Sequence, residues 1–213
     1  MARLGRPRTF DRDAAIDESL HLFWEHGYAS TSLAQLKTAI GGGISAPSFY
    51  AAFGSKEALY EECVGRYLAT YARVTECLWD KALPPRDALA LALRRSAAMQ
   101  CERGHPKGCM VAMDAMASMP HDAASAPLTK SRFRTRAGIR SCVGRAVESG
   151  ELAADTPVAT LSFVFDSFLL GLTSLARDGA KLSAMEAAVD EVLRLWDAYA
   201  VGLCVRVFVE VSG

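Results

Sequence analysis

Apolar residues recur at helical spacing along most of the chain, and this pattern predicts an all-α protein. The first apolar stripe follows a candidate N-cap at Asp11 and runs from Ile16 to Phe23, which predicts a helix of about fifteen residues. A second, shorter stripe follows Ser32 and Gln35, which have the spacing of a capping box. The N-terminal part of the chain is therefore expected to begin with two helices.

The stretch GGGISAPSFYAAFGSKEALY predicts a glycine turn, a short helix and the start of a longer helix. Ser45 is a suitable N-cap because its hydroxyl can accept a hydrogen bond from a free amide of the first turn. Phe49 and Phe53 lie four positions apart and so share an inward face. Ser55 has the position of a cap for the next helix. The order helix, helix, turn, short helix is that of a three-helix domain containing a helix-turn-helix.

ASTSLAQLKTAI followed by ISAPSFYAAFGSKEAL resembles the N-terminal domain of tetracycline-repressor-type (TetR family) transcriptional regulators. The resemblance covers residues 9 to 67 and rests on order, spacing and residue type together. It implies an N-terminal helix-turn-helix DNA-binding domain with a basic arm in residues 1–56, and a C-terminal helical ligand-binding and dimerisation domain in residues 57–213. The turn departs from the family, because Gly41, Gly42 and Gly43 stand where members usually have one glycine. The tilt of the short helix is left open by this insertion.

The matched motif implies where the protein would contact a double-stranded DNA operator. Phosphate contacts are expected from Thr31, Ser32, Tyr50 and Lys56, and base contacts from Ser45, Ala46, Pro47 and Ser48. The chain carries 24 basic and 24 acidic side chains, so attraction to DNA has to come from a local patch. Arg3, Arg6 and Arg8 precede the first helix and could enter a minor groove as an arm, with a solvated tail as the alternative.

Three more helical segments are expected before residue 150. A long helix runs from Lys56 to about Asp80 and is closed by two prolines, and a second spans residues 87 to 103. The third, residues 128 to 149, is rich in arginine, and we interpret this charge as a solvated helix face rather than a second nucleic-acid surface.

Methionines recur every third position from Met110 to Met119, and this spacing fits either core packing or an adaptable pocket wall. The pocket hypothesis places a small, largely apolar effector among the following side chains: Tyr71, Met113, Met116, Phe163 and Asp166. The long helix from Ser55 would then carry the signal to the DNA-binding domain.

Cys101, His105 and Cys109 are evenly spaced in a loop rich in glycine. A metal site and a redox-active pair of Cys101 and Cys109 are both possible interpretations. An ordinary loop whose cysteines have neither role is favoured because the spacing matches no zinc pattern. RGHPKGCMV, ESGELAADTP and LTSLARDGA resemble the regulatory domain of the ComR-like branch of the family, whose namesake senses copper. No resident cofactor is expected.

The segment VATLSFVFDSFLLGLTSLARDGA is apolar around most of its circumference. Its length approaches that of a membrane span, but Asp166 and the surrounding hydroxyls argue against insertion in a bilayer. We therefore expect this helix and the last one to form a four-helix interface between two subunits. The interface residues expected from the spacing are Phe168, Leu172, Val192 and Trp196.

Enzyme motifs such as GxSxG, a Walker loop, HExxH or GxGxxG do not occur in the sequence. A thiol catalyst using Cys109 with His105 or His121 is the rival reading, and it has no further support. The six cysteines form no CxxC pair and point to a reducing cytoplasm. The sequence thus predicts a homodimeric repressor released from DNA by a small molecule, with metal or thiol sensing through Cys101, His105 and Cys109 as the alternative.

Overall fold

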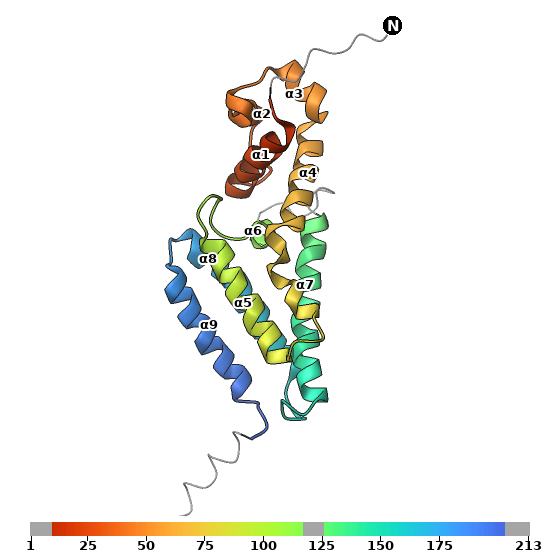
Figure 1. Ribbon diagram of the computed structural model, residues 1–213, viewed down its shortest axis with the longest axis vertical. Coiled ribbons are helices and arrows are strands. Elements are labelled where there is room, and N and C mark those ends of the chain that lie inside the picture. Colours follow the sequence, from red (N-terminus) through yellow and green to blue (C-terminus); the bar gives the residue numbers. More distant parts are fainter. Residues whose placement is uncertain (1–9, 117–125, 203–213) are drawn as a thin grey trace, which may run out of the picture.

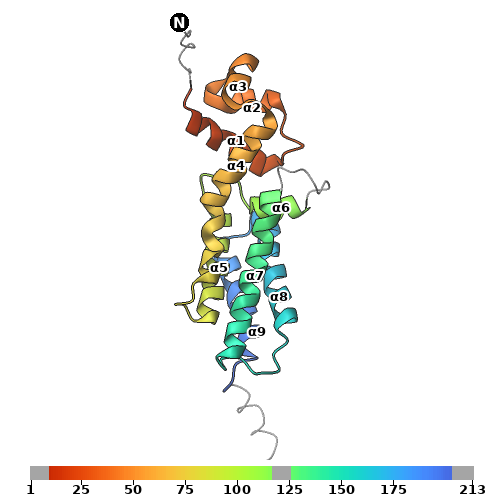
Figure 2. The same ribbon diagram turned by 90° about the vertical axis from the view of Figure 1, so that its right-hand side faces the viewer.

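The computed structural model describes residues 10–116 and 126–202, which form an elongated all-α molecule (Figure 1). A small group of three helices caps one end, α4 leads from it, and a longer helical bundle makes up the rest (Figure 2). In chain order the helices are α1 (Arg12–His26), α2 (Leu33–Ala39), α3 (Ala46–Phe53), α4 (Lys56–Ala69), α5 (Pro85–Cys101), α6 (Met110–Met116), α7 (Ala126–Glu148), α8 (Val158–Arg177) and α9 (Leu182–Asp197). The predicted all-α fold is confirmed.

The first three helices begin where their capping residues predict. The Asp11 carboxylate accepts a hydrogen bond from the Asp13 amide at 2.8 Å. The Ser32 amide donates to Gln35 Oε1 at 2.7 Å, while the Gln35 amide donates to Ser32 Oγ at 3.2 Å, which completes the capping box. These contacts satisfy amides that have no partner inside the helix, so local sequence alone sets the helix starts.

The inserted glycines form a short 3₁₀ turn, η1 (Ile40–Gly42), between α2 and α3. Gly41, Gly42 and Gly43 all have positive φ, at 56°, 75° and 122°, which glycine adopts readily. The turn is closed by the Gly43 amide, which donates to the Ile40 carbonyl at 2.9 Å. The Gly41 amide donates to the Glu18 carboxylate at 2.9 Å and so ties the turn to α1. The longer turn is thus accommodated without opening the domain.

One hydrophobic cluster fills the three-helix end of the molecule and continues beyond it. We call it the first core cluster; its buried members run from Ala15, Phe23 and Trp24 on α1 through Phe49, Leu59 and Tyr67 to Met99, Met110 and Leu128. The last three belong to α5, α6 and α7. Because these helices contribute to the same cluster, the end domain and the bundle share one core at their junction.

The helix predicted from Lys56 to about Asp80 is interrupted, and that prediction is wrong. α4 ends at Ala69, Thr70 leaves the helical region with φ −121° and ψ −84°, and a 3₁₀ segment, η2 (Tyr71–Trp79), follows. The Thr70 hydroxyl donates to the Arg66 carbonyl at 2.7 Å, a side-chain bond that competes with the helical pattern. Thr70, Val74 and Thr75 are also β-branched, which lowers helix propensity in this stretch.

The bundle is built from α5, α7, α8 and α9, which contact one another around a second hydrophobic cluster. In the part of the chain that the structure describes, α8 is the one helix long and apolar enough to span a membrane by length and composition. Its Asp166 is buried in mid-helix and pairs with Arg136 of α7 at 2.7 Å. Its inner side packs against α5, α7 and α9, while Phe163, Val164 and Leu175 of the same helix are exposed.

Candidate functional site

The outward face at the start of α3 is formed by small side chains, with two serine hydroxyls among them. Ser45 Oγ accepts a hydrogen bond from the Ser48 amide at 3.2 Å, and the two hydroxyls are 2.9 Å apart. Pro47 and Ser48 are exposed, and Tyr50 keeps 51% of its surface. The inward face is fixed by Phe49 and Phe53, both buried in the first core cluster, so α3 projects this surface from a firm base.

The residues expected to contact phosphates differ in how far their side chains are exposed. Ser32 is exposed at the start of α2. Thr31, by contrast, is fully buried, and its hydroxyl donates to the Gly27 carbonyl at 2.8 Å. A direct contact between the Thr31 side chain and DNA is therefore ruled out in this conformation. Arg3, Arg6 and Arg8 lie outside the described residues.

Lys56 is half-buried beside Tyr28, in the loop that follows α1, rather than free at the surface. Its ammonium donates to the Tyr28 carbonyl at 2.6 Å and lies 4.2 Å from the centre of the Tyr28 ring. Burial lowers the pKa of Lys56 below its ordinary value. Two of its three N–H donors are left by this hydrogen bond, and they are the ones that could reach a phosphate.

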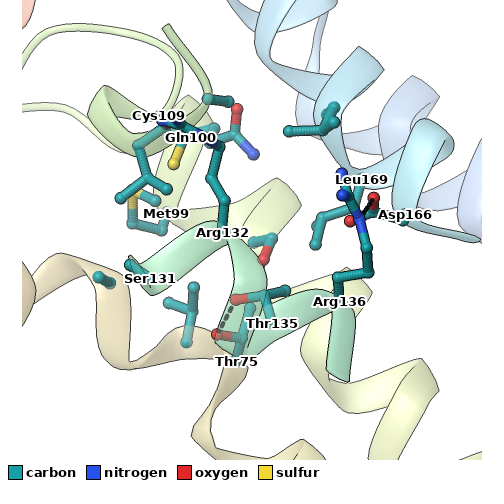
Figure 3. A pocket seen from close by; sticks show the side chains of 16 residues that line it. Thr75, Met99, Gln100, Cys109, Ser131, Arg132, Thr135, Arg136, Asp166 and Leu169 are labelled. Carbon is teal, nitrogen blue, oxygen red and sulfur yellow. Dashed lines mark hydrogen bonds and ion pairs between the residues drawn. The ribbon is translucent and has the colours of Figure 1, made fainter. Parts of the chain in front are cut away.

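A cavity of about 60 Å³ lies in the bundle, near the junction with the end domain. Its walls come from η2, α5, α6, α7 and α8, so residues far apart in the sequence surround it (Figure 3). The apolar lining includes Met99, Val111 and Leu169, and the polar lining includes Gln100 and Asp166. A mostly apolar space with a few polar groups is typical of a small-molecule site.

The N-terminal end of α6 connects this cavity to α4. Cys109, Val111 and Ala112 line the cavity, while the intervening Met110 amide donates to the Tyr67 hydroxyl at 3.1 Å. The same hydroxyl donates to Cys109 Sγ at 3.3 Å. Tyr67 is fully buried, and burial raises the pKa of its phenol. A shift of α6 would therefore move the Tyr67 hydroxyl and α4, the helix that leads to the three-helix end.

Comparison with known proteins decides the family. Residues 15–63 match the family described as "Bacterial regulatory proteins, tetR family". The chain is 32% identical over 194 residues to the HTH-type transcriptional repressor ComR of Escherichia coli (strain K12), with 90% of this chain and 91% of ComR covered. The chain belongs to the TetR family.

Among solved structures, a double cysteine mutant of the TetR family transcriptional regulator CifR is similar over its whole length. That structure, complexed with a 26bp double-strand operator DNA, has a TM-score of 0.77 and 35% identity and covers 90% of this chain and 100% of the CifR chain. The HTH-type transcriptional repressor BdcR of Escherichia coli (strain K12) is 34% identical over 107 residues, 50% of this chain and 53% of BdcR. The predicted TetR fold, with an N-terminal helix-turn-helix and a C-terminal helical domain, is thereby confirmed. These relatives are transcriptional regulators, not enzymes.

Of the five side chains expected to form a ligand pocket, the four that the structure describes do not gather around one cavity. Asp166 lines the cavity described above, whereas Tyr71 packs on Trp24 at a centroid distance of 4.9 Å. Phe163 is 58% exposed beside Arg136. Met113 packs against the first core cluster, and Met116 ends α6. The methionine spacing does not tell which face of α6 meets the cavity.

The metal and thiol hypothesis finds no geometric support. Cys101 Sγ contacts Met185 Sδ at 3.1 Å, Cys109 meets Tyr67, and the His105 ring stacks on Trp24 at 4.5 Å. These side chains point to different neighbours. Within residues 10–116 and 126–202, no group of three or more His, Cys, Asp or Glu side chains could hold a metal ion. The rival thiol pair of Cys109 with His121 involves a residue outside the described ranges.

The predicted interface residues lie mostly inside the protomer. Leu172 is fully buried, and Trp196 is 1% exposed with its indole donating to Glu151 at 3.0 Å. Phe168 and Val192 are half-buried against the second cluster. Leu172 and Trp196 thus face the interior of the protomer, whereas Phe168 and Val192 keep part of their surface, and the subunit interface stays a prediction. Both helices are apolar on several sides, so the spacing did not separate the inner face from the outer. The outer apolar side chains are Phe163, Val164 and Leu175 on α8 and Leu195 on α9.

Sequence reasoning missed the cavity residues of α5 and α7. Ser96 and Gln100 are each 2% exposed and lie one turn apart, on the buried side of a helix otherwise rich in Ala and Leu. Two polar residues four apart on an apolar face are a signal that could have been noticed. Arg132 and Arg136 were assigned to a solvated face, but both line the cavity and form ion pairs.

Proposed function

We propose that the protein is a homodimeric transcriptional repressor that binds an operator through α3 and leaves it when a small molecule occupies the cavity of the bundle. The observation that carries the proposal is the exposed polar face of α3, built on a buried aromatic back, in a chain that matches a transcriptional repressor along nearly its whole length. A CifR structure with operator DNA supports the same role for this helix-turn-helix. We place its activity in the cytoplasm.

Base recognition by α3 would rest on small groups. Ser45, Pro47 and Ser48 can meet thymine methyl groups or form single hydrogen bonds, and α3 carries no arginine or glutamine for a bidentate base contact. Specificity would therefore depend partly on the shape of the DNA and on the arm. Operator sites for a dimer would be arranged as a pseudo-palindrome.

Binding of the purified full-length chain to the DNA upstream of its own coding region tests the proposal. Fluorescence anisotropy should give a higher affinity for that DNA than for a scrambled duplex at the same salt concentration. Tyr50→Phe should weaken both complexes alike, because we assign the Tyr50 hydroxyl to a phosphate. Tyr199→Phe, at the far end of the bundle, is the matched control. Equal affinity for both duplexes would contradict sequence-specific binding at this site.

Lys56 has a test of its own, since its ammonium is shared with Tyr28. Loss of one phosphate contact in Lys56→Ala should reduce the slope of log K against log salt by about one unit. An unchanged slope would show that Lys56 serves only to hold the Tyr28 carbonyl.

A further inference from the structure

The two arginines at the cavity are already neutralised by carboxylates of the same chain. Arg136 Nε donates to Asp166 Oδ2 at 2.7 Å. Arg132 Nη1 donates to Asp114 Oδ2 at 2.7 Å and to the Val111 carbonyl at 2.9 Å, while Nη2 donates to Thr129. Each cation beside the cavity therefore has its own anion, and the site offers no uncompensated charge to an ionic ligand.

Hydrogen-bonding groups that are not charged do remain open toward the cavity. Gln100 lies on α5 with 2% of its surface exposed, and its Oε1 accepts a hydrogen bond from the Thr173 hydroxyl at 2.8 Å. That contact leaves the two N–H donors of the Gln100 amide, which find no partner among the described residues. The Ser96 hydroxyl, one turn earlier and also 2% exposed, has no partner within the same ranges. Figure 3 shows the Gln100 amide among the side chains that line the cavity.

Both residues line the cavity, and donors that open into an apolar cavity without a protein acceptor favour a bound molecule that carries an oxygen acceptor. The cavity volume of about 60 Å³ sets the size of that molecule. Since one water needs about 10–15 Å³ of such volume, the space suits a molecule of about four to six non-hydrogen atoms. Met99, Val111 and Leu169 surround the rest of it with apolar surface.

We propose that the effector is a small uncharged molecule, a short aliphatic chain ending in a hydroxyl or carbonyl group whose oxygen accepts hydrogen bonds from the Gln100 amide and the Ser96 hydroxyl. A carboxylate in the same place would lie near Asp166, and an ammonium would lie near Arg136. Asp166 and Arg136 already pair with one another, so either ion would lose its hydration without gaining a free counter-charge. The regulatory role of this ligand rests on the proposed function, whereas its binding to the cavity does not require DNA.

Four ligands of equal chain length test the charge requirement on the DNA-free, full-length protein: 1-butanol, butanone, butanoate and butylammonium. Saturation-transfer NMR titrations at neutral pH should show binding of the alcohol and the ketone at least tenfold tighter than binding of either ion. The inference is overturned if butanoate or butylammonium binds as tightly as 1-butanol, or if neither neutral compound binds.

Variants of the full chain test the location. Gln100→Leu keeps the side-chain size and should weaken butanol binding about fivefold to tenfold, and Ser96→Ala should weaken it less. Ser167→Ala, on the exposed side of α8, is the matched control. Ala112→Leu fills the cavity from α6 and should abolish binding, with circular dichroism as the check that the protein is folded. Full butanol affinity in folded Gln100→Leu or Ala112→Leu would place the ligand elsewhere and overturn the inference.

Anisotropy with operator DNA separates this inference from the proposed function. Butanol binding that depends on Gln100 without any operator binding would leave the ligand class standing and reject the repressor. Operator binding without any neutral ligand binding would leave the repressor standing and reject the ligand class.

Discussion

At the scale of single residues, the sequence predicts interactions between residues within one helical turn of each other, such as helix caps. Asp11, Ser32 and Ser45 were identified as caps, and each accepts a hydrogen bond from an amide two or three residues later. Thr31 was misjudged because its burial depends on the end of α1, where its hydroxyl donates a hydrogen bond to the carbonyl of the C-cap residue Gly27. A helix cap is a local interaction, whereas the exposure of a side chain depends on the whole fold.

Gly41 and Gly42 make a matched pair for a stability test. Both have positive φ, so an alanine at either position should cost about 1–2 kcal/mol of unfolding free energy. A Cβ at Gly41 would also stand 2.8 Å from Phe10 Cβ, whereas at Gly42 it would meet nothing within 4 Å. Gly41→Ala should therefore be the more destabilising of the two in urea denaturation. Equal losses would show that Phe10 moves aside at no cost.

At the scale of elements, the break after α4 changes how the two ends of the protein communicate. A single rigid helix was expected to carry the signal, but α4 stops at Ala69. The contact that remains is lateral: the Tyr67 hydroxyl joins α4 to the Met110 amide of α6, and Trp24 of α1 stacks on His105 in the loop before α6. We infer that α6 and this loop, rather than α4 alone, pass a movement at the cavity to the DNA-binding end.

The role of the Tyr67 hydroxyl can be measured without a ligand. Tyr67→Phe leaves the Met110 amide without its acceptor and should speed hydrogen exchange in residues 109 to 116. Tyr71→Phe is the control, because the Tyr71 hydroxyl has no hydrogen-bond partner among the residues described. Exchange that is unchanged in Tyr67→Phe would show that this hydrogen bond does not hold α6.

His21 on α1 should make stability depend on pH. Burial, aided by the electrostatic interaction with His105 and opposed by that with Asp17, lowers the pKa of His21 below its ordinary value of 6.5. The unfolded chain then binds more protons than the folded chain below about pH 6.5, so the unfolding free energy should fall as the pH drops through that range and stay level above it. Urea denaturation at several pH values should show a smaller fall in His21→Gln. His26→Gln, at the exposed end of α1, should behave like the unchanged protein; a fall of the same size in His21→Gln would assign the effect to other groups.

At the scale of the whole molecule, the order and type of the helices were predictable because amphipathic spacing and glycine breaks recur throughout the chain. The cavity was not predictable in the same way. Gln100, Arg136 and Asp166 come from three helices, and they meet only because of how α5, α7 and α8 cross. The exposed side of α8 and α9 was not predicted for a related reason. When a helix is apolar on all sides, its sequence does not indicate which side packs against the neighbouring helices.

The proposed dimer is best tested on that outer face. Leu175 and Leu195 keep 45% and 43% of their surface, so Leu175→Glu or Leu195→Glu should leave the protomer folded but place a charge in a subunit contact. Sedimentation should show a monomer with an unchanged circular dichroism spectrum. Leu172→Glu should instead unfold the protomer, because Leu172 is fully buried within it. A stable dimer in both outer variants would move the interface away from α8 and α9.

The shared core at the junction decides how this regulator could be recombined with others. A chain cut at residue 56 would lose Leu59, Tyr60 and Cys63, which close the first core cluster from the α4 side. A hybrid that borrows this DNA-binding end therefore has to keep α4 as far as Thr70. Its new sensing half also has to present an aromatic surface to Trp24, since His105 and Tyr71 cover that indole here. Exchange of whole domains between such proteins is thus constrained by the two side chains, His105 and Tyr71, that cover Trp24 at the junction.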